Sequence, residues 1–118
     1  MRVLIVDDST YIRNTLKSSL LENGYEIAGE AKDGEEAIDL AIELKPDIIT
    51  LDNILPDMTG IDILNILKDK ELKPFVIMIS AIGQESTRVR AEELGVSHYL
   101  TKPIDHQNLV NILKEAGL

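Results

Sequence analysis

The hydrophobic and polar residues of the chain alternate between short apolar runs and longer segments with helical spacing. The runs "IITL" and "FVIMI" are almost continuously apolar, which is typical of strands that are covered on both faces. The run "EIAGEA" is weaker and indicates an edge strand. Five strands are expected, at residues 2–6, 26–31, 48–51, 75–79 and 97–100.

A segment with helical spacing follows each expected strand. Ser9 and Asp105 are candidate N-caps, while Gly24 and Pro46 mark helix ends. The expected helices cover about 10–23, 34–44, 60–69, 84–94 and 106–116. The side chains expected to face inward are Ile12, Leu16, Leu20, Ala37, Ile38, Ala41, Ile42, Leu109, Ile112, Leu113 and Ala116. The stretch "QESTRVRAEEL" has few apolar residues and fits either a thin surface helix or a loosely packed helix that moves.

This alternation predicts an α/β fold, a doubly wound parallel five-stranded sheet with helices on both faces. The 118 residues are expected to form one domain, 1–118. In the flavodoxin-like strand order 2-1-3-4-5, the first and third strands flank the point at which strand order reverses. Ligands of such sheets bind there, outside the carboxyl ends of the strands.

Composition narrows the class of protein. The net charge of −9 disfavours direct binding to a nucleic-acid backbone, and the absence of cysteine excludes disulfides and thiolate metal sites. No apolar run approaches the roughly 18 residues of a membrane span, and the N-terminus carries no signal-peptide pattern. We expect a cytoplasmic protein without membrane insertion.

Polar residues stand at the expected strand ends. Asp7 and Asp8 follow the first strand, Asp52 the third, Ser80 the fourth and Lys102 the fifth. Three clustered carboxylates need a cation, and Mg²⁺ prefers oxygen ligands together with phosphate. Lys102 and Ser80 could bind that phosphate. Asp52 is the most central carboxylate and the candidate nucleophile, which would form an acyl phosphate.

Each residue also has an ordinary structural interpretation. Asp7 and Asp8 could form a helix cap and a solvated turn, and Asp52 could begin an Asx-turn before Pro56. Ser80 could be a loop hydroxyl, and Lys102 a surface lysine. His98 and His106 are interpreted as surface residues. The combination of the carboxylates with Lys102 favours a functional site over these structural interpretations.

Four motifs in order, "VDD", "LDNILPDMTG", "ISA" and "YLTKP", resemble the receiver domain of two-component response regulators, the CheY-like superfamily. The resemblance covers nearly the whole chain. It implies that Asp52 is the phosphoacceptor and that the Mg²⁺ (or Mn²⁺) ligands are Asp7, Asp8, Asp52 and the Ile54 backbone carbonyl, with Asp7 acting mainly through metal-bound water. It further implies phosphoryl or switch roles for Ser80, Lys102 and Tyr99, and a cis Lys102–Pro103 peptide, which an X–Pro bond tolerates.

Two residues depart from the family pattern. Asn53 replaces an apolar residue, and Ile54 is apolar where many members have a polar side chain. Their side chains, with residues 82 and 83, are expected to flank the path of attacking water. An apolar Ile54 is therefore expected to slow hydrolysis of the acyl phosphate.

The resemblance implies a phosphorylation-controlled signalling module rather than an enzyme with an external substrate. Its expected partners are a sensor histidine kinase or phosphotransfer protein and an output protein on the face of the fourth helix, fifth strand and fifth helix. A stand-alone chemotaxis-type regulator is expected because no effector domain follows Leu118. The alternative is a small Mg²⁺ phosphohydrolase with an Asp nucleophile, but Ile54 stands where its second carboxylate belongs. A flavin-binding module is disfavoured by the acidic residues after the first strand.

Overall fold

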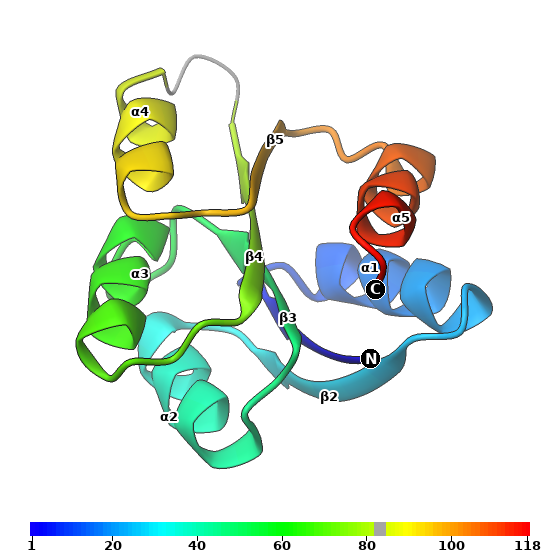
Figure 1. Cartoon of the computed structure of the whole chain (residues 1–118), viewed down its shortest axis with the longest axis horizontal. Coiled ribbons are helices and arrows are strands. Elements are labelled where there is room, and N and C mark those ends of the chain that lie inside the picture. Colours follow the sequence, from blue (N-terminus) through cyan, green and yellow to red (C-terminus); the bar gives the residue numbers. More distant parts are fainter. Residues whose placement is uncertain (82–84) are drawn as a thin grey trace.

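The computed structural model describes residues 1–81 and 85–118, which alternate between strands and helices (Figure 1). The strands are β1 (Arg2–Val6), β2 (Glu26–Ala31), β3 (Ile48–Asp52), β4 (Phe75–Ser80) and β5 (His98–Thr101). The helices are α1 (Thr10–Glu22), α2 (Gly34–Leu44), α3 (Gly60–Asp69), α4 (Glu85–Glu93) and α5 (His106–Glu115). All paired strands are parallel, in the order β2-β1-β3-β4-β5. The predicted fold class and strand order are confirmed.

Helices cover both faces of the sheet. Figure 1 shows α1 and α5 on one side and α2, α3 and α4 on the other. Successive residues of the central strands pack into different cores, since side chains of a strand alternate between its faces. Ile48 and Ile77 pack with α1 and α5, whereas Ile49 and Met78 pack with the other three helices. This explains why β3 is buried along its whole length and reads as an uninterrupted apolar run.

The helix termini are set by local side chains. Ser9 and Asp105 cap α1 and α5, accepting from the backbone N–H groups of Ile12 and Asn108, as predicted. Gly24 follows α1 with a φ of +87°, which suits glycine in a left-handed helix end. No helix in the described part of the chain has the length and apolar content that crossing a bilayer requires.

Two predicted core positions are wrong. Ile42 is 40% exposed, because the buried stripe of α2 is narrow and runs through Ala37 and Ala41. Ala116 is exposed, because α5 ends at Glu115 and Ala116 only caps it. β5 also begins one residue later than predicted, and β3 and β4 extend to Asp52 and Ser80, one residue further than predicted.

Helix α4 is weakly anchored. Ala91 is its one fully buried residue among Glu85–Glu93, and Val89 is 48% exposed. Its charged residues pair with each other along the surface, Arg88 with Glu92 and Arg90 with Glu93. The predicted start of this helix, residue 84, lies outside the described residues.

Candidate functional site

Three carboxylates meet at the carboxyl ends of β1 and β3. Asp7 and Asp8 follow β1, Asp52 ends β3, and the two strands are hydrogen-bonded neighbours. Each aspartate places a carboxylate oxygen within 4.8 Å of the others. Asp7 and Asp52 are only 2% and 5% exposed, whereas Asp8 is exposed. The site is therefore buried at Asp7 and Asp52 and open to solvent at Asp8.

Lys102 joins the two buried carboxylates. Its ammonium nitrogen lies 3.3 Å from Asp7 Oδ2 and 3.5 Å from Asp52 Oδ1. The backbone of Lys102 is also fixed, because Lys102 N donates to Ser80 O at 2.8 Å. The Lys102–Pro103 peptide is cis in the structure. Among the described residues, one ammonium group thus contacts two of the three clustered carboxylates, so the cluster keeps a negative excess.

The Asp7 side chain is held from two sides. Ser9 N donates to its Oδ1 at 2.9 Å, and Lys102 engages its other oxygen. Its backbone is also fixed, because Arg13 donates through Nη1 to the Asp7 carbonyl at 2.7 Å and Asp7 N donates to Ala31 O at 3.0 Å. Asp7 is therefore a rigid neighbour for Asp52.

Asp52 is destabilised as an anion. Burial first, and the nearby Asp7 charge second, raise its pKa from 3.8 to about 6, although Lys102 and the Ile54 N–H oppose the rise. A carboxylate with a raised pKa is a more basic oxygen nucleophile that is still ionised at neutral pH. A cation bound between the carboxylates would stabilise the charged form of Asp52 and so counter this rise in pKa.

The residues present fit a divalent cation. The donors are hard oxygens, which Mg²⁺ and Mn²⁺ accept, and two carboxylates with a backbone carbonyl leave room for water or phosphate. Asp8 is exposed and makes no hydrogen bond or ion pair within the described residues, so its oxygens are available. Ile54 follows Asp52 closely enough for its N–H to reach Asp52 Oδ1 at 3.4 Å.

Two residues next to the site, Ser80 and Asn53, have a buried side-chain oxygen without a hydrogen bond to any described residue. Ser80 is fully buried at the end of β4, and neither its Oγ nor the Oδ1 of Asn53 has a partner in the described part of the chain. Asn53 is adjacent to β4, since its N–H donates to Ile79 O. Buried polar atoms without partners are rare in native proteins, so each indicates a partner in another state or an ordered water.

Tyr99 contacts helix α4. It is half-buried on β5, packs against the core formed with α4, and has the guanidinium of Arg88 5.5 Å from its ring centre. A cation at this distance over an aromatic ring is attracted to it. Tyr99 therefore links β5 to α4.

The two histidines differ from each other. His98 is exposed beside Phe75, as predicted, with ring centres 6.3 Å apart. His106 is half-buried, and its Nδ1 is buried without a partner in the described residues. It lines a groove with Ser9 and Lys102, so the prediction of a plain surface residue is wrong.

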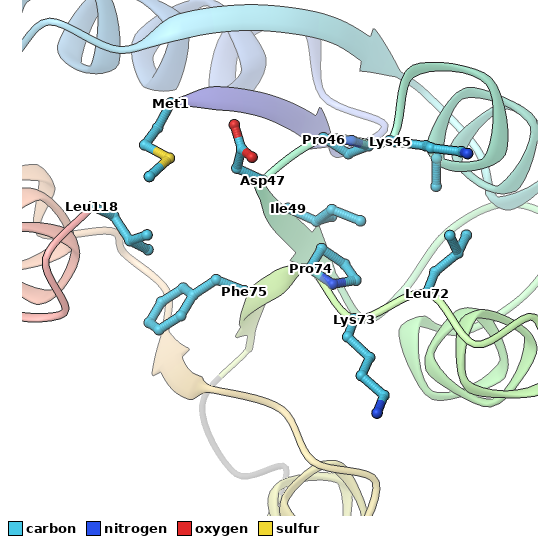
Figure 2. A pocket seen from close by; sticks show the side chains of 11 residues that line it. Met1, Lys45, Pro46, Asp47, Ile49, Leu72, Lys73, Pro74, Phe75 and Leu118 are labelled. Carbon is cyan, nitrogen blue, oxygen red and sulfur yellow. The ribbon is translucent and has the colours of Figure 1, made fainter.

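A pocket of about 410 Å³ lies at the opposite end of the sheet. It is lined by both chain termini and by residues before β3 and β4, and Figure 2 shows the amines of Lys45 and Lys73 directed away from its centre. Its base is apolar, formed by residues such as Ile49 and Phe75. It offers no clustered reactive groups and is separate from the carboxylate site.

Sequence reasoning missed two residues that support the site. Arg13 binds the Asp7 carbonyl and pairs with Glu30, with an Nε–Oε1 distance of 3.4 Å. Asp57 accepts from the N–H groups of Gly34 and Glu35 at the start of α2. Helical spacing places Arg13 near Ser9, which could have suggested the first contact. Nothing local suggests the second, because its partners are 23 and 22 residues away.

Comparisons with known proteins agree with this geometry. A sequence model of the response regulator receiver domain matches residues 3–114. The chain is 39% identical over 116 residues to chemotaxis protein CheY of Thermotoga maritima, covering 98% of this chain and 97% of that protein. It is 40% identical over 105 residues to a protein-glutamate methylesterase/protein-glutamine glutaminase of Archaeoglobus fulgidus, covering 87% of this chain and 30% of that protein.

A solved structure shows the same similarity in three dimensions. A chain of the CheX–CheY–BeF₃–Mg²⁺ complex of Borrelia burgdorferi superposes with a TM-score of 0.90 at 33% identity, covering 100% of this chain and 90% of that one. The family match spans most of the chain, and both the strand order and the carboxylate cluster at the switch point accord with it. The chain belongs to the receiver domains of two-component response regulators.

Proposed function

We propose that Asp52 accepts a phosphoryl group from a phosphohistidine of a sensor kinase or phosphotransfer protein. The observation that carries this proposal is the contact of one ammonium group, Lys102 Nζ, with two buried carboxylates beside a third that is exposed. Such a cluster has more negative than positive charge, so it suits the binding of a cation together with a phosphoryl group. Asp52 is the carboxylate best placed to react, since its strand β3 lies between β1, which precedes Asp7, and β4, which ends at Ser80.

In the transfer, an Asp52 carboxylate oxygen forms a bond to phosphorus while the bond from phosphorus to the donor's imidazole nitrogen breaks. The imidazole leaves with the electron pair of that bond and takes a proton. Asp52 must be ionised to attack, and a pKa of about 6 keeps it largely ionised at neutral pH. Lys102 already lies 3.5 Å from the attacking carboxylate and supplies a positive charge to the incoming phosphoryl oxygens.

The metal ligands in this proposal are Asp8, Asp52, the Ile54 carbonyl and, through water, Asp7. Mg²⁺ or Mn²⁺ bound there neutralises charge on the carboxylates and on the phosphoryl oxygens. The fixed position of Asp7, with both carboxylate oxygens engaged, supports an indirect role for it. The exposure of Asp8 supports a direct one.

Phosphorylation is then read out at the face of α4, β5 and α5. The new phosphoryl oxygens provide an acceptor for the Ser80 hydroxyl, which is buried and has no partner among residues 1–81 and 85–118. Movement of Ser80 then shifts α4, a helix with little buried surface and correspondingly low local stability. Tyr99 packs against the same core and follows that movement. An output protein that binds this face distinguishes the two states.

The biological setting that we propose is chemotaxis signalling in the cytoplasm, with the chain acting as a stand-alone regulator. Its support is the similarity to a chemotaxis protein over nearly the full length of both chains. The protein would catalyse its own phosphorylation and slow dephosphorylation without turning over an external substrate. No observation favours the phosphohydrolase alternative, since the position of its second carboxylate is the apolar, 57% exposed Ile54.

Intact mass measurement after incubation with acetyl phosphate and Mg²⁺ tests the proposal. The expected result is a gain of one phosphoryl group that is abolished by Asp52→Asn and by chelation. Asp39→Asn is the matched control, because Asp39 is an exposed aspartate on α2 whose substitution removes the same charge. An unmodified wild-type protein, or a phosphoryl gain that persists in Asp52→Asn, would overturn the proposal.

A further inference from the structure

We propose that Asp57 is a positioning residue for the metal site. Its carboxylate fixes the loop between β3 and α3, residues 53–59, against the first turn of α2. This loop carries the Ile54 carbonyl, so its position sets the position of a proposed metal ligand. The inference rests on the proposed function, because the ligand set is the one assigned there.

Asp57 binds α2 with both carboxylate oxygens. Gly34 N donates to Oδ1 at 2.8 Å and Glu35 N donates to Oδ2 at 3.0 Å. These are N-terminal backbone donors of the helix, which have no acceptor within the helix itself. The hydrogen bonds from these two N–H groups help to lower the pKa of Asp57 below its usual 3.8, so the group is an anion at neutral pH. A charged acceptor makes such hydrogen bonds short and directional.

An apolar contact accompanies the polar one. Gly34 lies so close to the neighbouring Met58 that a Cβ added there would be 2.2 Å from Met58 Cγ and 2.5 Å from its Sδ. A residue with a Cβ at position 34 would require the Met58 side chain to shift. The loop is therefore attached to α2 at two adjacent residues, by hydrogen bonds at Asp57 and by packing at Met58.

The loop is stiff enough to transmit this attachment to Ile54. Ile54 and Thr59 form an antiparallel bridge, and Leu55 N donates to Met58 O at 3.2 Å. Gly60 N closes the loop by donating to Asn53 O at 2.7 Å. With these internal hydrogen bonds, a displacement at Asp57 moves the other limb of the loop as well, where Ile54 lies two residues after Asp52.

A purely structural role would make Asp57 only a cap for α2. The protein contains its own control for that role, because Asp33 caps the same helix end and accepts from Glu36 N at 2.8 Å. Asp33 belongs to the segment before α2 and, within the described residues, makes no hydrogen bond or ion pair with the 53–59 loop. Asp33→Ala and Asp57→Ala each remove one capping carboxylate, but only the second releases the loop.

Binding of Mn²⁺, followed by the electron paramagnetic resonance signal of the free ion, distinguishes the two roles in the unphosphorylated protein. We expect Asp57→Ala to weaken Mn²⁺ binding about tenfold, the lower end of the usual loss when a group that orients metal ligands is removed. Asp33→Ala is expected to stay within about twofold of wild type, since its effect is confined to the helix. Asp57→Asn retains one acceptor oxygen and is expected to lie between wild type and Asp57→Ala.

Gly34→Ala tests the same attachment without touching a carboxylate. The new methyl group displaces Met58, so Mn²⁺ binding should weaken although alanine favours the helix more than glycine does. Equal losses in Asp33→Ala and Asp57→Ala, or wild-type affinity in Asp57→Ala, would overturn the inference. Failure of the proposed function looks different, because wild type would then bind no Mn²⁺, or Asp8→Asn would bind it as well as wild type.

Discussion

Replacing Asp52 with asparagine should stabilise the metal-free protein at neutral pH. The substitution keeps the shape of the side chain and removes a charge that is only 5% exposed and lies beside Asp7. It also removes the proposed phosphoacceptor. A single change is therefore expected to raise stability and abolish function, which is typical of a site whose electrostatic strain serves its chemistry.

The magnitude follows from the raised pKa. Each pKa unit corresponds to about 1.4 kcal/mol, so a rise from 3.8 to about 6 costs the native state about 3 kcal/mol when Asp52 is ionised. Between these two pKa values the native state binds the proton more tightly than the unfolded chain does. The favourable contribution of the protonated group is thus complete below pH 3.8 and is lost as pH rises through about 6. Asp52→Asn should be more stable than wild type by about 2–3 kcal/mol at neutral pH.

Urea unfolding followed by far-ultraviolet circular dichroism, in buffer with EDTA, measures this difference as a function of pH. The gain over wild type should be greatest above pH 6 and should shrink toward zero near pH 4. Asp39→Asn controls for the loss of one negative charge from a chain of net charge −9. Added Mg²⁺ should stabilise wild type and narrow the gap, because a ligand that binds only the native state stabilises it.

Two results would refute this reasoning. If Asp52→Asn were no more stable than Asp39→Asn above pH 6, burial and the Asp7 charge would not strain the Asp52 carboxylate as the structure indicates. If the gain were the same at all pH values, it would not arise from ionisation of Asp52. In either case the account of Asp52 as an activated nucleophile would lose its electrostatic basis.

Three further predictions concern other residues of the site. Lys102→Ala should lower the free energy of unfolding by about 1–3 kcal/mol in EDTA at neutral pH, because two buried carboxylates lose their charged partner. Thermal unfolding measures this loss, and unchanged stability would count against the ion pairs. Ile54→Asn should shorten the phosphoryl half-life roughly two- to tenfold by adding a hydrogen-bonding group at an exposed position, and equal half-lives by intact mass would refute the expectation. The lowered pKa of Asp57 stabilises the native state above pH 3.8, and this contribution should be lost as pH falls through the lowered pKa. Acid unfolding should therefore show this loss of stability in wild type and not in Asp57→Asn.

The fold was predictable because its signals are local. Continuous apolar runs mark buried strands, and the caps Ser9 and Asp105 act within their own helix turns. The errors at Ile42 and Ala116 have the same origin, since spacing alone does not show how wide the buried stripe of a helix is or where its last turn ends. Hydropathy identifies which segments are helices more reliably than it identifies their faces.

The candidate site was predictable where residues stand at strand ends. Parallel strands bring Asp7, Asp52 and Lys102 to the same edge of the sheet, and the structure places them in contact. The contact between Asp57 and α2 could not be predicted in this way, because it depends on how a loop packs against a helix 22 residues earlier. The missing hydrogen bond of Asn53 is likewise a property of the folded state alone.

The central claim is that Asp52, and no other carboxylate of the cluster, accepts the phosphoryl group. Borohydride reduces an acyl phosphate of aspartate to homoserine, so reduction of the phosphorylated protein followed by peptide mass mapping identifies the residue. We expect homoserine at position 52, dependent on acetyl phosphate and Mg²⁺, with Asp7 and Asp8 unchanged. Homoserine at position 7 or 8, or its absence from a protein that has gained the mass of a phosphoryl group, would contradict it.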